Sequence, residues 1–275
     1  MANHSYWQRR IESATNSLFN KSQSQIDKQL RKYYKSIAQQ AISDYEAVYN
    51  KILAQQADGK QITPADLYKL DTYWEKQAQV RQQLQKLGEK EISLLTKNFE
   101  STYFDTYHSI SLEGMNIFNK LDNNIVNQVL NSVWCADGKS WSQRIWHNMS
   151  LLQETLDEGL IQCVAGGKSS SYLKKQLMER FNVSYSNADA IARTELAHIQ
   201  TQAAQQRYKD YGIKQMEVMA ERDSRTCKIC EAHDGEIYNV TDTMPVPFHP
   251  RCRCCMLPVV EYNNKDKSFR ALDSN

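Results

Sequence analysis

Five of the seven cysteines of this chain lie close together towards its C-terminal end. Cys227 and Cys230 form a C-x2-C pair, and a second segment, which starts at His249 after eighteen intervening residues, reads H-x2-C-x-C-C. Two such pairs on separate segments can supply the four thiolate and imidazole ligands of one tetrahedral metal ion. The spacing therefore predicts a small module that folds around a metal.

Zinc fits this set of ligands best. The histidine and the compact pairing favour a single zinc ion over an iron–sulfur cluster, and four protein ligands leave no open position, which predicts a structural Zn2+. The preferred ligands are Cys227, Cys230, His249 and Cys252, and Cys254 competes for either of the last two places. Because a module this small buries little apolar surface, we expect the metal to supply much of its folding free energy, on the order of 10–16 kcal/mol.

The rest of the sequence indicates where such thiols would be found. The first residues lack the apolar segment of a secretory signal, and no long apolar run predicts a membrane span. We therefore expect a reducing compartment, where clustered thiols bind metals more often than they form disulfides, although a disulfide module is the alternative. The net charge of +2 gives no bulk electrostatic argument for nucleic acid as a partner.

Most of the chain has the pattern of helices. Helix breakers are scarce, with 9 glycines and 5 prolines. Apolar residues recur at helical spacing over residues 26–52 and again over residues 67–99, and Thr63 and Pro64 form a helix start between the two stripes. Two long helices joined by a short turn predict a long N-terminal helical hairpin arm.

A second helical part is predicted after this arm. Ser140 begins a capping pattern, and an apolar stripe follows over residues 141–164. The Gly-Gly-Lys-Ser run at residues 166–169 lacks the full spacing of a phosphate loop, so we interpret it as a connection between helices. A further capping pattern at residues 186–189 predicts the start of another helix, which Gly212 ends.

The pattern becomes that of strands after Gly212. Residues 215–220 alternate in hydrophobicity, residues 236–240 follow the turn residues Asp234-Gly235, and residues 254–260 could form a third strand. The predicted fold class is mainly α with a small C-terminal zinc-bound β module (α+β). The predicted parts are a helical arm (residues 1–133), a helical middle domain (134–212), a zinc-knuckle β module (213–262) and a flexible tail (263–275).

Four basic residues lie close to the predicted metal ligands and are candidates for contacts with nucleic acid. They could contact phosphate groups or the acidic surface of a partner, and a solvated rim around the module is the alternative. The residues are Arg225, Lys228, Arg251 and Arg253.

Two other groups of charged residues have both a structural and a catalytic interpretation. His233 and Asp234 could form the pair of a metal-dependent nuclease, but they also fit the turn chemistry of a hairpin, which we favour. Arg193 and Glu195 are expected to form ion pairs with neighbouring elements. A catalytic Glu195 is the alternative, which we favour less because no matching acid or base is spaced with it on the same helix face.

Six short motifs follow one another between Trp134 and Pro258. They are W-x2-D-G-K from Trp134, S-x2-I-W from Ser142, A-R-T-E from Ala192, D-x-R-T-C-x2-C from Asp223, D-G from Asp234 and P-x-H-P-x-C-R-C from Pro247. As an ordered set these motifs resemble the phage minor head proteins, also called the Mu F-like or head morphogenesis family. The N-terminal arm carries no comparable motif.

The resemblance implies a virion component of a tailed phage or prophage. Family members are incorporated into the procapsid in few copies, bind the portal protein, and influence head assembly and DNA delivery. It implies a place at the portal vertex of the head, and in the host cytoplasm during assembly. The portal protein is the expected partner, with scaffold protein, major capsid protein and phage DNA as further candidates and no membrane. We expect no enzymatic activity; the alternative functions are a zinc-containing DNA-binding protein and a metal-dependent nuclease.

Overall fold

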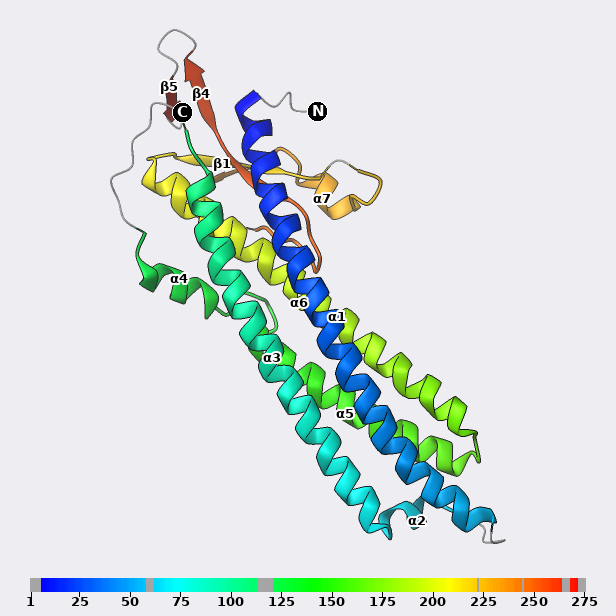
Figure 1. Ribbon diagram of the computed structural model, residues 1–275. Coiled ribbons are helices and arrows are strands. Elements are labelled where there is room, and N and C mark those ends of the chain that lie inside the picture. The colour runs from blue at the N-terminus through cyan, green and yellow to red at the C-terminus, as the bar shows by residue number, and fades with distance from the viewer. Residues whose placement is uncertain are drawn as a thin grey trace. The chain divides into compact units, whose positions relative to one another are not determined.

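The computed structural model describes residues 6–57, 62–112, 121–221, 223–243, 245–263 and 268–271. It is mainly helical with small antiparallel sheets near the C-terminal end, which confirms the predicted fold class (Figure 1). The helices are α1 (Tyr6–Ala57), α2 (Pro64–Tyr68), α3 (Asp71–Ser109), α4 (Asn123–Leu130), α5 (Trp141–Ala165), α6 (Ser170–Asp210) and α7 (Lys228–Ala232). The strands are β1 (Gln215–Met219), β2 (Ile237–Asn239), β3 (Cys255–Pro258), β4 (Val260–Asn263) and β5 (Ser268–Ala271). None of the described helices is both long and apolar enough to cross a membrane.

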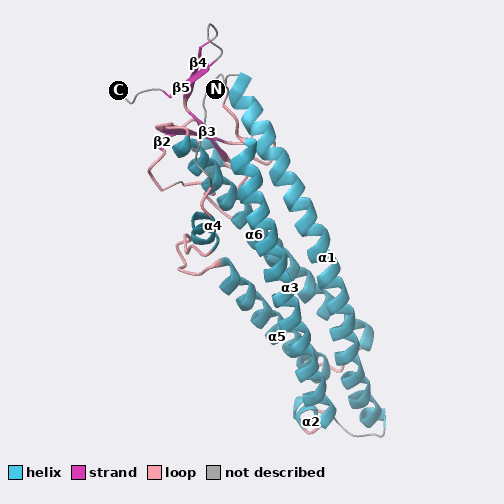
Figure 2. Cartoon of the chain, turned by 60° about the vertical axis from the view of Figure 1, so that its left-hand side comes forward, coloured by secondary structure: helices cyan, strands magenta, loops and turns pink. Residues whose placement is uncertain are grey.

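The chain forms two compact units, each built from segments that are distant in the sequence. All five strands belong to the first, which we call the sheet unit, and the second is the helical unit (Figure 2). The sheet unit combines Met1–Ile26, Leu95–Gly138 and Ala190–Asn275, and the helical unit combines Asp27–Leu94 and Lys139–Asp189. The division of the chain after residues 133, 212 and 262 stays a prediction.

The starts of two helices agree with the capping patterns in the sequence. The backbone N–H of Thr63, before α2, donates to the carboxylate of Asp66 at 3.0 Å. The side chain of Ser140, before α5, accepts from the N–H of Gln143 at 3.3 Å. Each contact provides a hydrogen-bond acceptor for a backbone N–H at the start of a helix, where the N–H groups have no partner inside the helix.

Two other predicted boundaries differ from the structure. The stripe that begins at Leu67 is divided, because α2 ends at Tyr68 and α3 starts at Asp71. The helix start predicted at residues 186–189 is wrong, since α6 continues through it from Ser170 to Asp210. No glycine or proline interrupts that stretch, and residues typical of caps are tolerated inside a helix that tertiary contacts stabilise.

The helical unit has a core of apolar and aromatic side chains from four long helices. Its segments of α1, α3, α5 and α6 run alongside one another in both views (Figures 1 and 2). The fully buried side chains include Leu30, Tyr45, Leu87, Leu156 and Leu177. Burial of large side chains at helical spacing is what the apolar stripes of the sequence predicted.

A buried polar group interrupts this core. The side chain of Glu91 is fully buried, and its carboxylate accepts a hydrogen bond from the Tyr34 hydroxyl at 3.2 Å. The amide of Asn148 donates to that hydroxyl at 3.2 Å and to the carbonyl of Ser184 at 2.9 Å. The second carboxylate oxygen of Glu91 has no hydrogen-bond partner among the described residues. Burial raises the pKa of Glu91 to about 8.

Gly88 allows the close packing of Trp146 in the helical unit. A Cβ atom at position 88 would lie 2.6 Å from the indole ring of Trp146. We expect Gly88→Ala to lower the free energy of unfolding by about 1–3 kcal/mol, even though alanine favours helix by about 1 kcal/mol. In a Trp146→Leu background the same substitution should become stabilising by about 1 kcal/mol. Urea denaturation of the four proteins measures both effects, and stabilisation by Gly88→Ala beside the intact tryptophan would contradict this account.

The sheet unit contains a three-stranded antiparallel sheet with the order β2-β1-β3. Met216 pairs with Tyr238 of β2 and with Pro258 of β3, so β1 is the central strand. The three segments predicted as strands are thus confirmed. A second pair, β4 with β5, joins Val260 to Ala271, and β5 lies in the part of the sequence that was predicted as a tail.

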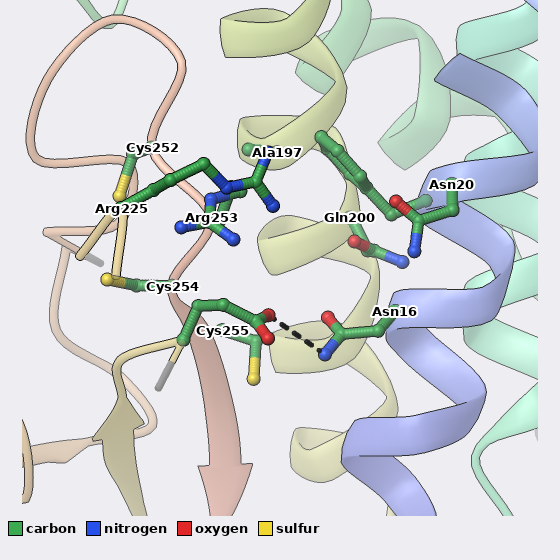
Figure 3. Close-up of a pocket in the computed structure, with 11 residues that line it drawn as sticks. Asn16, Asn20, Ala197, Gln200, Arg225, Cys252, Arg253, Cys254 and Cys255 are labelled. Carbon is green, nitrogen blue, oxygen red and sulfur yellow. Dashed lines mark hydrogen bonds between the residues drawn. The ribbon is translucent and has the colours of Figure 1, made fainter. Parts of the chain in front are cut away.

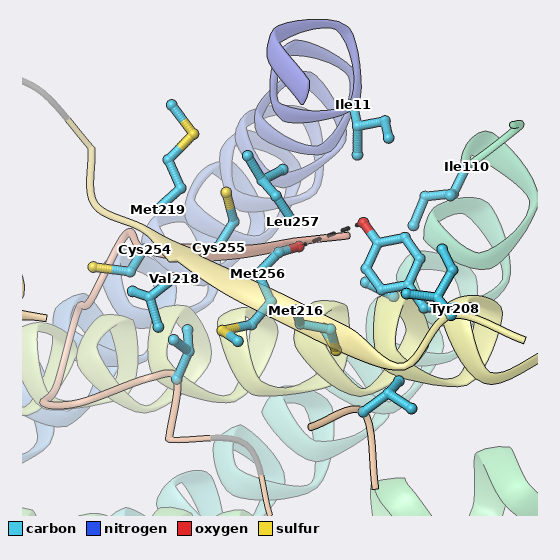
Figure 4. Close-up of a cluster of buried hydrophobic side chains, with 14 of the residues drawn as sticks. Ile11, Ile110, Tyr208, Met216, Val218, Met219, Cys254, Cys255, Met256 and Leu257 are labelled. Atoms are coloured by element: carbon cyan, nitrogen blue, oxygen red, sulfur yellow. Dashed lines mark hydrogen bonds between the residues drawn. The ribbon is translucent and has the colours of Figure 1, made fainter. Parts of the chain in front are cut away.

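The three-stranded sheet does not rely on its own residues alone for a core. The side chains of Met216, Val218 and Leu257 are buried in one cluster with helix residues, among them Tyr208 (Figure 4). The Tyr208 hydroxyl also donates to the carbonyl of Met256 at 3.4 Å. The expectation that the β module buries little apolar surface is therefore wrong, because the helices of its own unit supply the missing partners.

Candidate metal centre

The first pair of predicted ligands lies at the start of α7. Cys227 caps this helix, and its sulfur accepts from the backbone N–H of Cys230 at 3.5 Å. This turn directs both thiols to the same side, so one short segment presents two sulfur ligands. We call residues 227–230 the first knuckle.

The second knuckle is the turn His249-Pro250-Arg251-Cys252. The N–H of Cys252 donates to the carbonyl of His249 at 3.1 Å, which closes the turn. Arg251 has a φ of 62°, in the left-handed region that residues with a side chain rarely adopt. This conformation brings the imidazole and the thiol of the turn to the first knuckle.

The structure brings all four predicted ligands together. The Nε2 atom of His249 lies 3.3 Å from the sulfur of Cys227 and 3.0 Å from that of Cys230. The sulfurs of Cys230 and Cys252 are 3.8 Å apart. A tetrahedral zinc ion bonded to two sulfurs at about 2.3 Å separates them by about 3.8 Å. The separation of these two sulfurs is thus compatible with a shared metal ion.

Cys254, the competing ligand, also lies in this cluster. Its sulfur belongs to a group with those of Cys230 and Cys252 in which all three atoms lie within 4.8 Å of one another. Cys227, Cys230 and His249 form a second such group. Cys230 is common to both groups, and each group of three donors could hold a metal ion.

The hydrogen bonding of His249 selects the tautomer that a metal requires. Its Nδ1 atom lies 2.8 Å from the backbone carbonyl oxygen of Pro250, which can only accept a hydrogen bond. The proton of a neutral ring is therefore on Nδ1, and the lone pair of Nε2 points at the thiols. A metal-binding histidine commonly donates its other N–H in this way.

The thiols have unequal affinities for protons. A hydrogen bond from Cys254 lowers the pKa of Cys252, which favours the thiolate form of this sulfur. Burial raises the pKa of Cys230 to about 12. A divalent cation beside both sulfurs would favour the thiolate form of each.

A residue that the sequence analysis did not single out holds the second knuckle in place. The hydroxyl of Thr194, on α6, accepts from the N–H of Arg251 at 3.0 Å and donates to the carbonyl of Ala190 at 2.6 Å. The next residue, Glu195, is buried and accepts from the indole N–H of Trp134 at 2.9 Å. Thr194, Glu195 and Trp134 all lie in motifs of the ordered set, which was the available signal for their role.

We expect Thr194→Val to loosen the second knuckle. Valine keeps the shape of threonine but leaves the N–H of Arg251 without its acceptor, which should cost about 1 kcal/mol of stability and about tenfold in metal affinity. Competition with a chelator measures the affinity, and Thr194→Ser, which keeps the hydroxyl, is the control. Equal zinc affinity in the valine and serine variants would contradict a role for this hydrogen bond.

The arginines beside the knuckles form ion pairs within the protein. Arg253 contacts both carboxylate oxygens of Asp223 at 2.7 Å, and Arg225 approaches the same carboxylate at 3.0 Å. The hydrogen bond from Arg253 holds the pKa of Asp223 well below its usual range. Both arginines line a cavity of about 240 Å³ together with Cys254 and Asn16 (Figure 3). Their ion pairs with Asp223 reduce the positive charge available to phosphate groups.

His233 and Asp234 have separate partners in the structure. His233 lies 2.7 Å from a carboxylate oxygen of Glu236 and stacks on Phe248, with ring centroids 4.3 Å apart. Asp234 accepts from the N–H of Ala220 at 2.9 Å, and Gly235 follows with a φ of 86°. These contacts are those of a folded turn, the interpretation that the sequence favoured.

The fold and the site define a mainly α-helical protein that carries a compact Cys/His cluster. The family model described as Phage Mu protein F like protein matches residues 154–257, which include the whole of α6 and the whole cluster. The resemblance inferred from the motifs is confirmed over this segment, and it indicates a phage head-related protein. The first two motifs, from Trp134 and Ser142, precede the matched residues. Comparison with curated proteins and with solved structures gives no match.

Proposed function

We propose that this chain is a minor head protein of a tailed phage or prophage that docks at the portal vertex and assists procapsid assembly and DNA packaging or delivery. The observation that supports it is the Mu F-like segment over residues 154–257, which carries the Cys/His cluster. In this proposal the portal protein is the main partner, and scaffold protein, major capsid protein and phage DNA are further ones. The protein is made in the host cytoplasm and becomes part of the head at the portal vertex.

The cluster serves this function as a structural zinc site without enzymatic activity. Cys227, Cys230, His249 and Cys252 hold the ion, and the coordination is complete without water or substrate. Zinc then fixes the two knuckles to each other beside α6. The knuckles held in this way present a rigid surface for assembly. The preference for zinc follows from three soft thiolates and one imidazole, a donor set that suits this metal in a tetrahedral geometry.

Co-expression with the portal protein of the same phage tests the proposal. The tagged full chain should retain the portal protein on an affinity column and should also be present in purified procapsids or virions. An unrelated tagged helical protein of similar size is the control for the column. Absence of the chain from procapsids and virions alike, together with no retention of the portal protein, would overturn the proposal.

A further inference from the structure

An open groove lies between α1 and α6 in the helical unit. It has a volume of about 380 Å³, and its floor is formed by the buried side chains of Tyr34, Ala38 and Phe181. Met178, which is 38% exposed, forms part of the wall. Because Ala38 is small, the two helices leave an apolar space large enough for a leucine-sized side chain.

The α1 side of the groove is basic. Arg31 and Lys35 line it, and they lie one helical turn apart. The Nε atom of Arg31 donates to Asp27 at 2.8 Å and its guanidinium lies over the ring of Tyr185, yet its side chain remains 65% exposed. The groove therefore combines an apolar floor with two cationic side chains at a helical spacing, of which Arg31 is partly neutralised by Asp27, whereas Lys35 has no ion pair among the described residues.

The same chain carries a surface with the complementary pattern. On α5, Leu151 is 42% exposed, and Glu154 and Glu158 are exposed three and seven residues further on. Residues at these spacings share one face of a helix. Glu154 and Glu158 are separated by one turn, which is the separation of Arg31 and Lys35. The outer face of α5 thus presents one apolar side chain beside a pair of carboxylates.

We propose that the groove of one copy receives the α5 face of a second copy. Leu151 enters the apolar space, and the two carboxylates lie against the basic side of the groove. Since the two surfaces differ, the contact is heterologous, and a pair of copies keeps one free groove and one free α5 face. Repetition of the contact builds a ring or an open chain. The charge pairs at its edge make the association weaken as salt rises.

Sedimentation velocity of the full-length protein over a range of concentrations tests this proposal. The wild-type protein should associate reversibly, and Leu151→Asp or Lys35→Glu should each weaken association about tenfold or more, the equivalent of about 1.4 kcal/mol. Both positions are exposed, so thermal unfolding should confirm that the variants are folded. Val133→Asp is the matched control and should associate like the wild type. Val133 is also apolar and 54% exposed, but it lies outside both the groove and α5.

Mixing variants distinguishes this contact from others. Leu151→Asp keeps an intact groove and Lys35→Glu keeps an intact α5 face, so an equimolar mixture should form one-to-one dimers and nothing larger. Combining Lys35→Glu with Glu158→Lys in one chain should restore association. A wild-type protein that is monomeric at every concentration would overturn the proposal, as would association that neither variant weakens. If Lys35→Glu loses association while Leu151→Asp associates like the wild type, the proposal is also overturned, because the groove then receives a segment other than α5.

Discussion

Cys230→Ala is expected to bind no stoichiometric zinc, whereas the wild-type protein should retain one ion per chain after dialysis. Cys230 is the thiol shared by both groups of donor atoms in the cluster, so its loss leaves neither group complete. The decrease in affinity should exceed the roughly 10–100-fold loss caused by removing a hydrogen-bond partner of a ligand. Metal analysis and chelator competition measure it. Cys135→Ala, which removes a cysteine outside the cluster, is the control and should bind zinc normally.

The structural consequence of this variant should be local. Because β1 and β3 pack into a cluster with Tyr208 and other helix residues, the sheet keeps apolar support without the metal. We expect proteases to cleave within residues 223–235, which include α7, and within residues 245–254, while the long helices remain intact. Unchanged protease resistance of both segments in zinc-free Cys230→Ala would contradict a structural role for the metal.

The same measurement identifies the fourth ligand. In the proposed coordination, His249→Ala and Cys252→Ala lose zinc as Cys230→Ala does, and Cys254→Ala keeps it. Retention of zinc by His249→Ala, with loss in Cys254→Ala, would instead assign the place to Cys254. Such a result would leave the zinc site intact and change only its ligand set.

The second large effect concerns the pH dependence of stability, which we expect Glu91 to dominate in the helical unit. In the unfolded chain this carboxyl has its usual pKa of 4.5, and in the folded protein burial raises it to about 8. Between these values the folded state binds one more proton than the unfolded state. The free energy of unfolding therefore falls as pH rises from about 5 to about 8, by about 4 kcal/mol in total.

Glu91→Gln should remove this dependence. The neutral amide can still accept the hydrogen bond from Tyr34, and it does not ionise. The variant should match the wild type near pH 5 within about 1 kcal/mol and be several kcal/mol more stable near pH 8. Chemical denaturation at a series of pH values measures the difference. Glu89→Gln, at an exposed position two residues away, is the control, and equal slopes in all three proteins would disprove the assignment.

The parts of this fold that could be predicted from the sequence are those that depend on patterns of a few neighbouring residues. The two Cys/His segments, the cap at Ser140 and the alternation of residues 215–220 each depend on a few neighbouring residues, and each is found in the structure. These patterns report backbone geometry over one or two turns, which is the range over which they are reliable.

The parts that escaped prediction depend on contacts between distant segments. The hydrogen bond between Thr194 and Arg251 joins residues far apart in the sequence, and although Thr194 lies in one of the ordered motifs, no local pattern pairs it with Arg251. The burial of Glu91 beside Tyr34 is of the same kind. The continuous α6 is an example of a local pattern that failed. Residues 186–189 have the pattern of a helix cap, but tertiary packing keeps them inside the helix.

The left-handed backbone of Arg251 restricts which amino acids this position can accept. Glycine would adopt a φ of 62° without steric cost, and asparagine would adopt it readily. Proline, with φ fixed near −65°, would destroy the turn, and valine or isoleucine would strain it severely. Relatives that keep this metal centre should therefore vary at the third residue of the His-Pro-Arg-Cys turn only among a narrow set. This restriction comes from the backbone conformation at Arg251 and is independent of the charge of its side chain.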